Sequence, residues 1–131
     1  MTQTSTETRH MAAGAVVAVV EDDASMLRAL GRLLRTAGFT VRAFVSAEDF
    51  LQVAHGPMPD CLVLDVQLGG ISGFDLHERL RARGAQVPTI FITAHDEPGT
   101  REQARRAGAI GFLRKPFDDQ ALITVIEQAV H

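Results

Sequence analysis

Residues 61–65 read Cys-Leu-Val-Leu-Asp, four consecutive apolar residues followed by a single carboxylate. A short, continuously apolar run predicts a strand covered on both faces, as in a parallel sheet flanked by helices. The carboxylate at the end of such a run lies at the carboxyl end of the strand, where functional groups gather in open α/β sheets. This stretch therefore predicts the fold class and one candidate site residue, Asp65.

Strand-like and helix-like segments alternate on both sides of this run. Further strands are expected at residues 16–20, 39–44, 89–92 and 110–113. Helices are expected at residues 26–37 and 46–55, around Leu76 and Leu80, and at residues 99–107 and 122–130. Repeated β-α alternation with short loops implies right-handed crossovers and helices on both faces of a parallel sheet. The predicted fold class is α/β, with one doubly wound, five-stranded, flavodoxin-like parallel sheet.

The composition of the 131-residue chain is that of an ordinary globular domain. Hydrophobic residues make up 46% and charged residues 22% of the chain, as is usual for such domains. The net charge of −3 gives no reason to expect a nucleic-acid-binding surface on this chain. With one cysteine, Cys61, an intrachain disulfide is excluded and a reducing compartment is favoured.

The sequence indicates neither a membrane-spanning helix nor a signal peptide. No apolar run approaches the ~18 residues of a membrane-spanning helix, and the start of the chain lacks the apolar core of a signal peptide. Residues 1–13 are expected to be a disordered leader, and residues 14–131 the folded domain. We expect the protein to act in the cytoplasm, without a membrane partner.

Polar residues follow four of the expected strands. Glu21-Asp22-Asp23 follow the first strand, Asp65 ends the third, Thr93 follows the fourth, and Lys115 comes after the fifth. If the strand order is 2-1-3-4-5, all of these strand ends meet at one edge of the sheet. Taken singly, the acidic run, Thr93 and Lys115 are more often a capped turn, a structural hydroxyl and a surface charge, and Asp65 is as often a cap or turn residue as a nucleophile. Their coincidence at four strand ends favours a functional site.

Phosphoryl transfer is the chemistry that fits this set of groups. Crowded carboxylates repel one another, and a folded protein tolerates them only with a compensating cation. Mg²⁺ is a natural cation here, because it is bound by a few carboxylates together with water or phosphate oxygens. An aspartate beside such a metal can attack a phosphoryl donor, while the lysine and the hydroxyl hold phosphoryl oxygens.

Four motifs follow one another along the chain. They are Val19-Val20-Glu21-Asp22-Asp23, Leu64-Asp65 with Gly73 eight residues on, Ile92-Thr93-Ala94, and Phe112-Leu113-Arg114-Lys115-Pro116-Phe117. Together they resemble the CheY-like receiver domains of two-component response regulators, from about Val16 to Val130. Residues 88–95 and 115–122 are most similar to FixJ-type regulators, which commonly carry a helix-turn-helix DNA-binding domain after the receiver. The resemblance also implies the strand order 2-1-3-4-5.

The resemblance implies the composition of a metal site. Asp65 would be the phospho-acceptor and a metal ligand, and Asp22 a direct ligand of Mg²⁺. Glu21, in place of the commoner aspartate, would hold metal-bound water, and the backbone carbonyl of Gln67 would be a further ligand. Gly69-Gly70 occupies a loop where the family often has a proline, so we expect a looser loop after the third strand.

The resemblance also implies which residues respond to phosphorylation. Thr93 would be the hydroxyl that follows the phosphoryl group, and Lys115 the cation that contacts it. Phe112 would be the switch aromatic, without the hydroxyl of the commoner tyrosine. His95, like Gln67, lies at a variable position that tunes the lifetime of the phosphate. The Lys115-Pro116 bond would be cis, which proline permits at small cost.

The leading functional hypothesis is therefore a phosphorylation switch. A sensor histidine kinase would present a phosphohistidine, and the added charge on Asp65 would draw Thr93 inward. Phe112 would then fill the vacated space and change the face formed by the fourth helix, the fifth strand and the fifth helix. That face is suited to a homodimer; its charged residues are Arg101, Arg105, Arg106, Arg114, Asp118 and Asp119. Beyond self-phosphorylation and autodephosphorylation, no enzymatic activity is expected.

Three other functions remain open from the sequence. A phosphatase of the haloacid-dehalogenase type also uses an aspartyl nucleophile with Mg²⁺, but it needs a second acid where this chain has Gln67. A flavodoxin-like cofactor binder has the same topology, although the chain has no Trp or Tyr to stack against a flavin. The third is a receiver that no longer takes up phosphate and serves only as an interaction module. The sequence identifies neither the cognate kinase nor the output.

Overall fold

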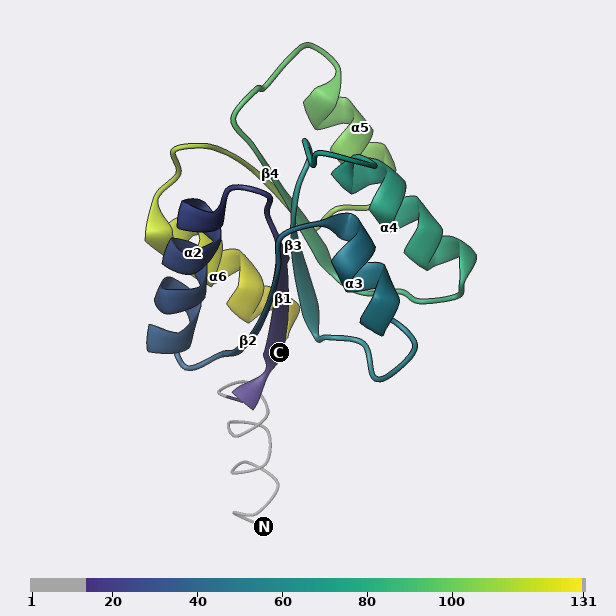
Figure 1. Cartoon of the computed structure of the whole chain (residues 1–131). Coiled ribbons are helices and arrows are strands. Elements are labelled where there is room, and N and C mark those ends of the chain that lie inside the picture. Colours follow the sequence, from purple (N-terminus) through teal and green to yellow (C-terminus); the bar gives the residue numbers. More distant parts are fainter. Residues whose placement is uncertain (1–13, 131) are drawn as a thin grey trace.

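The computed structural model describes residues 14–130, and the expected leader at residues 1–13 lies outside the described residues. Strands and helices alternate along the described chain (Figure 1). The strands are β1 (Val16–Val20), β2 (Thr40–Phe44), β3 (Cys61–Asp65), β4 (Thr89–Thr93) and β5 (Gly111–Arg114). The helices are α2 (Ala24–Thr36), α3 (Ala47–Val53), α4 (Gly73–Ala82), α5 (Thr100–Arg106) and α6 (Asp119–Ala129).

The five strands form one parallel sheet in the order β2-β1-β3-β4-β5. This confirms the predicted fold class and strand order. The register places Val20 opposite Leu64 and Asp65 opposite Ile92, so β1, β3 and β4 end close to one another. The strand ends that carry the candidate site residues therefore meet at one edge.

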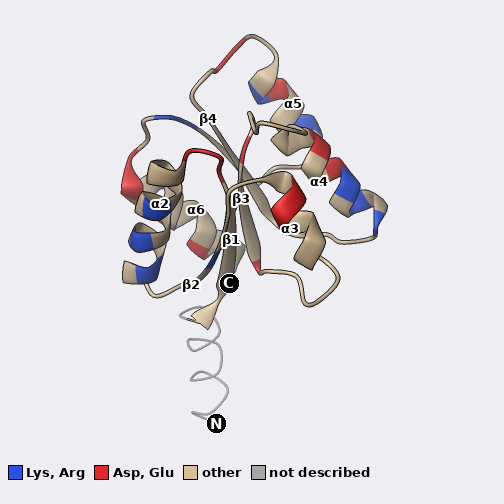
Figure 2. Ribbon diagram, viewed as in Figure 1, with Lys and Arg blue, Asp and Glu red and all other residues tan. Residues whose placement is uncertain are grey.

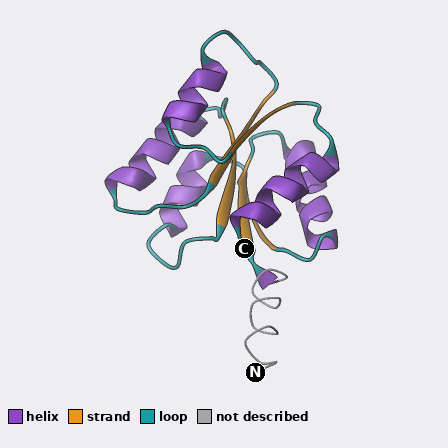
Figure 3. Ribbon diagram, turned by 180° about the vertical axis from the view of Figure 1, so that it is seen from behind, coloured by secondary structure: helices purple, strands orange, loops and turns teal. Residues whose placement is uncertain are grey.

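Helices cover both faces of the sheet. Helices α2 and α6 lie on one face, and α3, α4 and α5 lie on the other (Figures 1 and 3). Side chains of a strand alternate between the two faces. Val17 and Val19 accordingly belong to one hydrophobic cluster, and Ala18 and Val20 to the other. Strand β3 is buried along its whole length, as its continuously apolar sequence predicts.

The first helix shows how local sequence fixes an element. The side chain of Asp23 caps α2 by accepting a hydrogen bond from the Met26 N–H at 3.1 Å. A cap of this kind satisfies one of the free N–H groups at the start of a helix. After the end of the helix, Gly38 has φ +100°. This is a left-handed conformation that glycine adopts without strain. Of the two caps that the sequence allowed, Asp23 and Ser25, the structure selects Asp23.

Most of the predicted bounds differ from the structure by one to three residues. Helix α6 begins at Asp119 rather than at residue 122, since the N–H groups of Ala121 and Leu122 both donate to the Asp118 carbonyl. Strand β5 is shifted by one residue, to Gly111–Arg114. The cis Lys115–Pro116 bond is present as expected. Within residues 14–130, no helix is both long enough and apolar enough to cross a membrane.

Candidate functional site

Three buried polar side chains gather where the central strands end. Glu21 follows β1 and is 0% exposed, Asp65 ends β3 and is 4% exposed, and Thr93 ends β4 and is 0% exposed. Acidic residues mark this end of the sheet in the loop that leaves β1 (Figure 2). Buried carboxylates are strongly destabilising unless a cation or hydrogen-bond donors compensate them. The site must therefore contain a positive partner.

Lys115 is that partner. Its Nζ donates to Glu21 Oε1 at 2.6 Å and to Asp65 Oδ2 at 2.9 Å. The side chain reaches both carboxylates from the segment after β5, and only 16% of it is exposed. A single ammonium thus bridges residues that are 94 and 50 positions away in the sequence. The structure brings together Glu21, Asp65 and Lys115, as the sequence predicts.

Burial and charge together set the protonation of the bridge. Burial raises the pKa of Glu21 to about 7, with the neighbouring Asp65 acting in the same direction and Lys115 opposing it. Burial acts to lower the pKa of Lys115, but its hydrogen bonds to Glu21 and Asp65 prevail, so this pKa is raised. Lys115 is therefore a fixed cation near neutral pH, whereas Glu21 is poised between its charged and neutral forms.

Asp22 completes a group of three carboxylates. One carboxylate oxygen from each of Glu21, Asp22 and Asp65 lies within 4.8 Å of the other two. Asp22 is exposed, so the group is open to solvent on its side. Mg²⁺ prefers oxygen ligands and keeps several of its waters, and this all-oxygen donor set fits it. Asp23, the third residue of the acidic run, is not part of this group, because its side chain caps α2.

The backbone around Asp65 is tightly constrained. The N–H of Gln67 donates to Asp65 Oδ1 at 2.9 Å, which orients the carboxylate. Gly73, the first residue of α4, lies so close that an added Cβ would be 2.3 Å from the Asp65 carbonyl oxygen. Only glycine permits such an approach of two backbone segments. The glycine eight residues after Asp65 thus has a packing reason in this structure.

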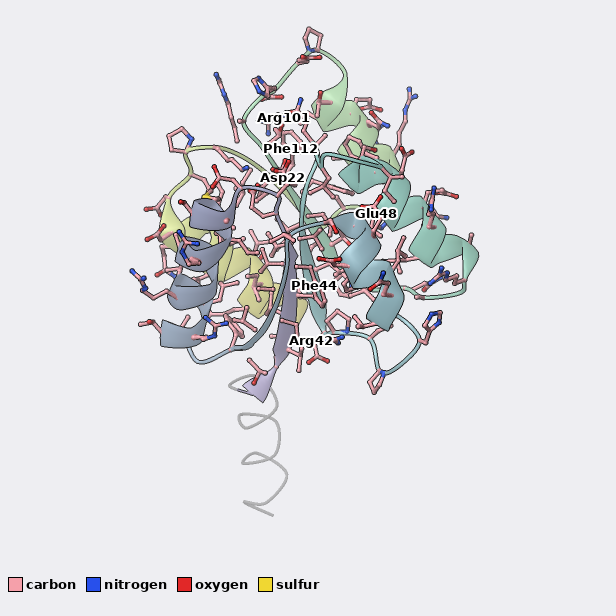
Figure 4. All side chains as sticks on the ribbon, viewed as in Figure 1. Asp22, Arg42, Phe44, Glu48, Arg101 and Phe112 are labelled. Carbon is pink, nitrogen blue, oxygen red and sulfur yellow. The ribbon has the colours of Figure 1, made fainter. Side chains whose placement is uncertain are left out.

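The loop of Gly69 and Gly70 is bordered by acidic side chains. A Cβ at Gly70 would be 2.6 Å from the carboxylate of Glu48, and one at Gly69 would be 3.9 Å from Asp22 Oδ2. Glu48 lies in the first turn of α3 (Figure 4). Glu48 could not be predicted from the sequence, because nothing in its position along the chain indicates contact with a loop after β3.

The hydroxyl of Thr93 is engaged with the loop that follows β4. Its Oγ1 donates to the His95 carbonyl at 3.1 Å and accepts from the His95 N–H at 3.0 Å. The predicted hydroxyl is therefore at the site edge, but both of its hydrogen bonds are local. To contact a phosphoryl group on Asp65, Thr93 would have to exchange these bonds for new ones.

Phe112 lies in β5, opposite Phe91 of β4, and is partly buried. The guanidinium carbon of Arg101 lies 4.8 Å from the centroid of the Phe112 ring. This is within the range of a cation–π interaction. The sequence predicts Arg101 on the adjoining face but does not indicate this contact, since the pairing depends on how α5 packs beside β5.

Residues 17–127 match the family profile described as "Response regulator receiver domain". The chain belongs to this family. Similar curated proteins include Nodulation protein W of Bradyrhizobium diazoefficiens, 44% identical over 88% of this chain and 51% of that protein. Transcriptional regulatory protein FixJ of the same organism is 38% identical over 86% of this chain and 55% of that protein. This receiver domain spans about half the length of these relatives.

Solved receiver domains have the same fold. A response regulator receiver protein from Burkholderia phymatum is 44% identical with a TM-score of 0.78, covering 88% of this chain and 94% of that one. Response regulator StyR is 47% identical with a TM-score of 0.80, covering 88% of this chain and 58% of that one. The "BeF3 Activated DrrB Receiver Domain" is 26% identical with a TM-score of 0.79, covering 88% and 97%. The predicted resemblance to FixJ-type regulators is confirmed by the match to FixJ itself.

Proposed function

We propose that this receiver domain is a phosphorylation switch with Asp65 as its acceptor. The observation that carries the proposal is the bridge from Lys115 Nζ to Glu21 and Asp65. This bridge holds the nucleophilic carboxylate beside a fixed cation. The carboxylates of Glu21 and Asp22 are close enough to Asp65 to share a metal ion with it. Such positioning and charge neutralisation are the main requirements of phosphoryl transfer.

The chemistry is transfer of one phosphoryl group. A carboxylate oxygen of Asp65 attacks the phosphorus of a phosphohistidine on a sensor histidine kinase, the P–N bond breaks, and an acyl phosphate forms. The Gln67 N–H orients the attacking carboxylate, and Lys115 compensates the added negative charge. Held by Glu21, Asp22, Asp65 and the Gln67 carbonyl, Mg²⁺ would supply additional charge neutralisation on the phosphoryl oxygens.

The response to phosphorylation begins at Thr93. The added charge attracts the hydroxyl, which leaves the backbone of His95 and turns toward Asp65. Phe112 then moves into the space that Thr93 vacates, and the face formed by α5, β5 and α6 changes its affinity for partners. Several charged residues of this face are paired within the chain: Arg101 with Asp96, and both Arg105 and Arg106 with Glu102. A homodimer through this face would therefore have to form around existing ion pairs.

The signal passes to an output carried by the longer regulators of this kind. Relatives named as transcriptional regulatory proteins are about twice as long as the stretch matched here. We expect the changed face to act on such an output, in the same chain or in a partner. Sedimentation of the domain with and without a phosphoryl mimic tests whether the face also forms a homodimer.

Intact-mass spectrometry tests the proposal. The domain is incubated with acetyl phosphate, with and without Mg²⁺, as wild type and as Asp65→Asn. The expected result is one phosphoryl adduct that requires both Mg²⁺ and Asp65. Absence of an adduct from the wild type would refute the switch and favour a receiver that serves only as an interaction module.

A further inference from the structure

Arg101 covers the proposed switch aromatic from the solvent side. It lies in the first turn of α5, and its guanidinium carbon is 4.8 Å from the ring centroid of Phe112 in β5 (Figure 4). Phe112 also borders a surface hollow of about 550 Å³, together with Arg101, Ala104, Ile110 and others. The partly buried ring thus borders open space at the surface, where the guanidinium of Arg101 is one of its contacts.

Asp96 holds Arg101 in this position. Its Oδ2 lies 3.0 Å from a terminal nitrogen of Arg101, and its side chain is only 21% exposed. Asp96 directly follows His95, whose backbone binds the Thr93 hydroxyl. A continuous series of contacts thus leads from Thr93 through the loop to Asp96, Arg101 and the Phe112 ring.

We infer that Arg101 is a positioning residue that latches Phe112 in the unphosphorylated conformation, with Asp96 as its anchor. The inference rests on the proposed function of Asp65 and Phe112 and adds a regulatory element to it. Inward movement of the ring breaks the cation–π contact, so the contact lowers the population of the switched state. When Thr93 leaves His95, the loop that carries Asp96 is released as well.

The other arginines of α5 show how an ordinary surface pair differs. Arg105 and Arg106 both pair with Glu102 on the exposed side of the same helix, and exposed pairs of this kind contribute little to stability. Arg101 differs because one side chain joins a loop carboxylate to an aromatic ring of a neighbouring strand. Arg106 is therefore a matched control, because it has the same charge on the same helix but does not border the hollow beside Phe112.

Titration with beryllofluoride, a mimic of the phosphoryl group, tests the latch. Isothermal titration calorimetry at saturating Mg²⁺ compares wild type, Arg101→Ala and Arg106→Ala. Exposed cation–π contacts contribute about 0.5–1 kcal/mol, so loss of the latch should tighten apparent binding about two- to fivefold. Simple electrostatics has the opposite sign, because removal of a positive charge weakens binding of an anion.

The controls separate the latch from the switch itself. Arg106→Ala should bind beryllofluoride as the wild type does or slightly more weakly. Arg101→Ala should have no effect in a Phe112→Leu background, since the ring that it covers is then absent. Unchanged or weaker binding by Arg101→Ala, with normal binding by the wild type, would overturn the latch alone. Failure of the wild type to bind the mimic would overturn the proposed function, and the latch with it.

Discussion

Replacement of Gly73 by alanine should both destabilise the domain and impair phosphoryl uptake. An added Cβ would be 2.3 Å from the Asp65 carbonyl oxygen and 3.0 Å from the Asp65 carbonyl carbon. Both atoms belong to the backbone of β3, which is buried along its length. The clash cannot be relieved by a side-chain rotation, so α4 must shift away from the acceptor strand.

The expected change in the free energy of unfolding of Gly73→Ala follows from two opposing effects. Gly→Ala in a helix is favourable by up to about 1 kcal/mol, whereas forcing extra atoms into a packed interior costs about 1–3 kcal/mol. Because the contact is with backbone, we expect the upper part of that range and a net loss of roughly 2 kcal/mol. For a chain of this length, the melting temperature should fall by roughly 6–10 °C.

Urea unfolding measures the loss of stability, and acetyl phosphate uptake measures the loss of reactivity at Asp65. The matched control is Gly31→Ala in α2, where an added Cβ would meet only the flexible guanidinium of Arg35 at 3.0 Å. That variant should be as stable as the wild type or more stable, and should take up phosphate normally. A Gly73→Ala variant as stable and as reactive as the wild type would show that the close approach of α4 to the Asp65 backbone does not require glycine.

Three further predictions concern single groups. The Cys61 thiol is 0% exposed and burial raises its pKa to about 12, so a thiol-reactive disulfide reagent at pH 8 should modify it only in the unfolded protein. Asp23→Ala removes the α2 cap and should cost about 1 kcal/mol in urea unfolding, whereas Asp23→Asn should retain most of the stability. In metal-free buffer, the Glu21 contribution to stability should fall as pH rises from about 4.5 to about 7 and level off above that, because the folded state holds a proton that the unfolded state has already lost. Glu21→Gln should flatten that fall, and an equal slope in the variant would show that Glu21 is not the group responsible.

The sequence was sufficient for the architecture because the architecture depends on local patterns. The continuously apolar β3 indicates a strand covered on both faces, and the alternation of strands and helices restricts the topology to few choices. Polar residues at strand ends could likewise be assigned to one edge of the sheet. For this reason the sequence alone predicts that Glu21, Asp65, Thr93 and Lys115 lie at this edge.

The sequence was insufficient where the contact depends on how elements pack. Nothing in the spacing of Arg101 and Phe112 indicates that a guanidinium in α5 covers a ring in β5. The position of Glu48 beside Gly70 depends on the packing of α3 near the loop after β3. The local engagement of Thr93 with His95 is a choice among hydrogen-bond partners that the residue type leaves open.

Chemical trapping of the acyl phosphate is the sharpest test of whether Asp65 carries the phosphoryl group. After incubation with acetyl phosphate and Mg²⁺, borohydride reduces an acyl phosphate of aspartate to homoserine, which peptide mapping by mass spectrometry locates. We predict homoserine at position 65. Its formation should depend on Mg²⁺ and should be lost in the Asp65→Asn variant. Homoserine at another aspartate, or a borohydride-resistant phosphate on a serine or threonine, would contradict it.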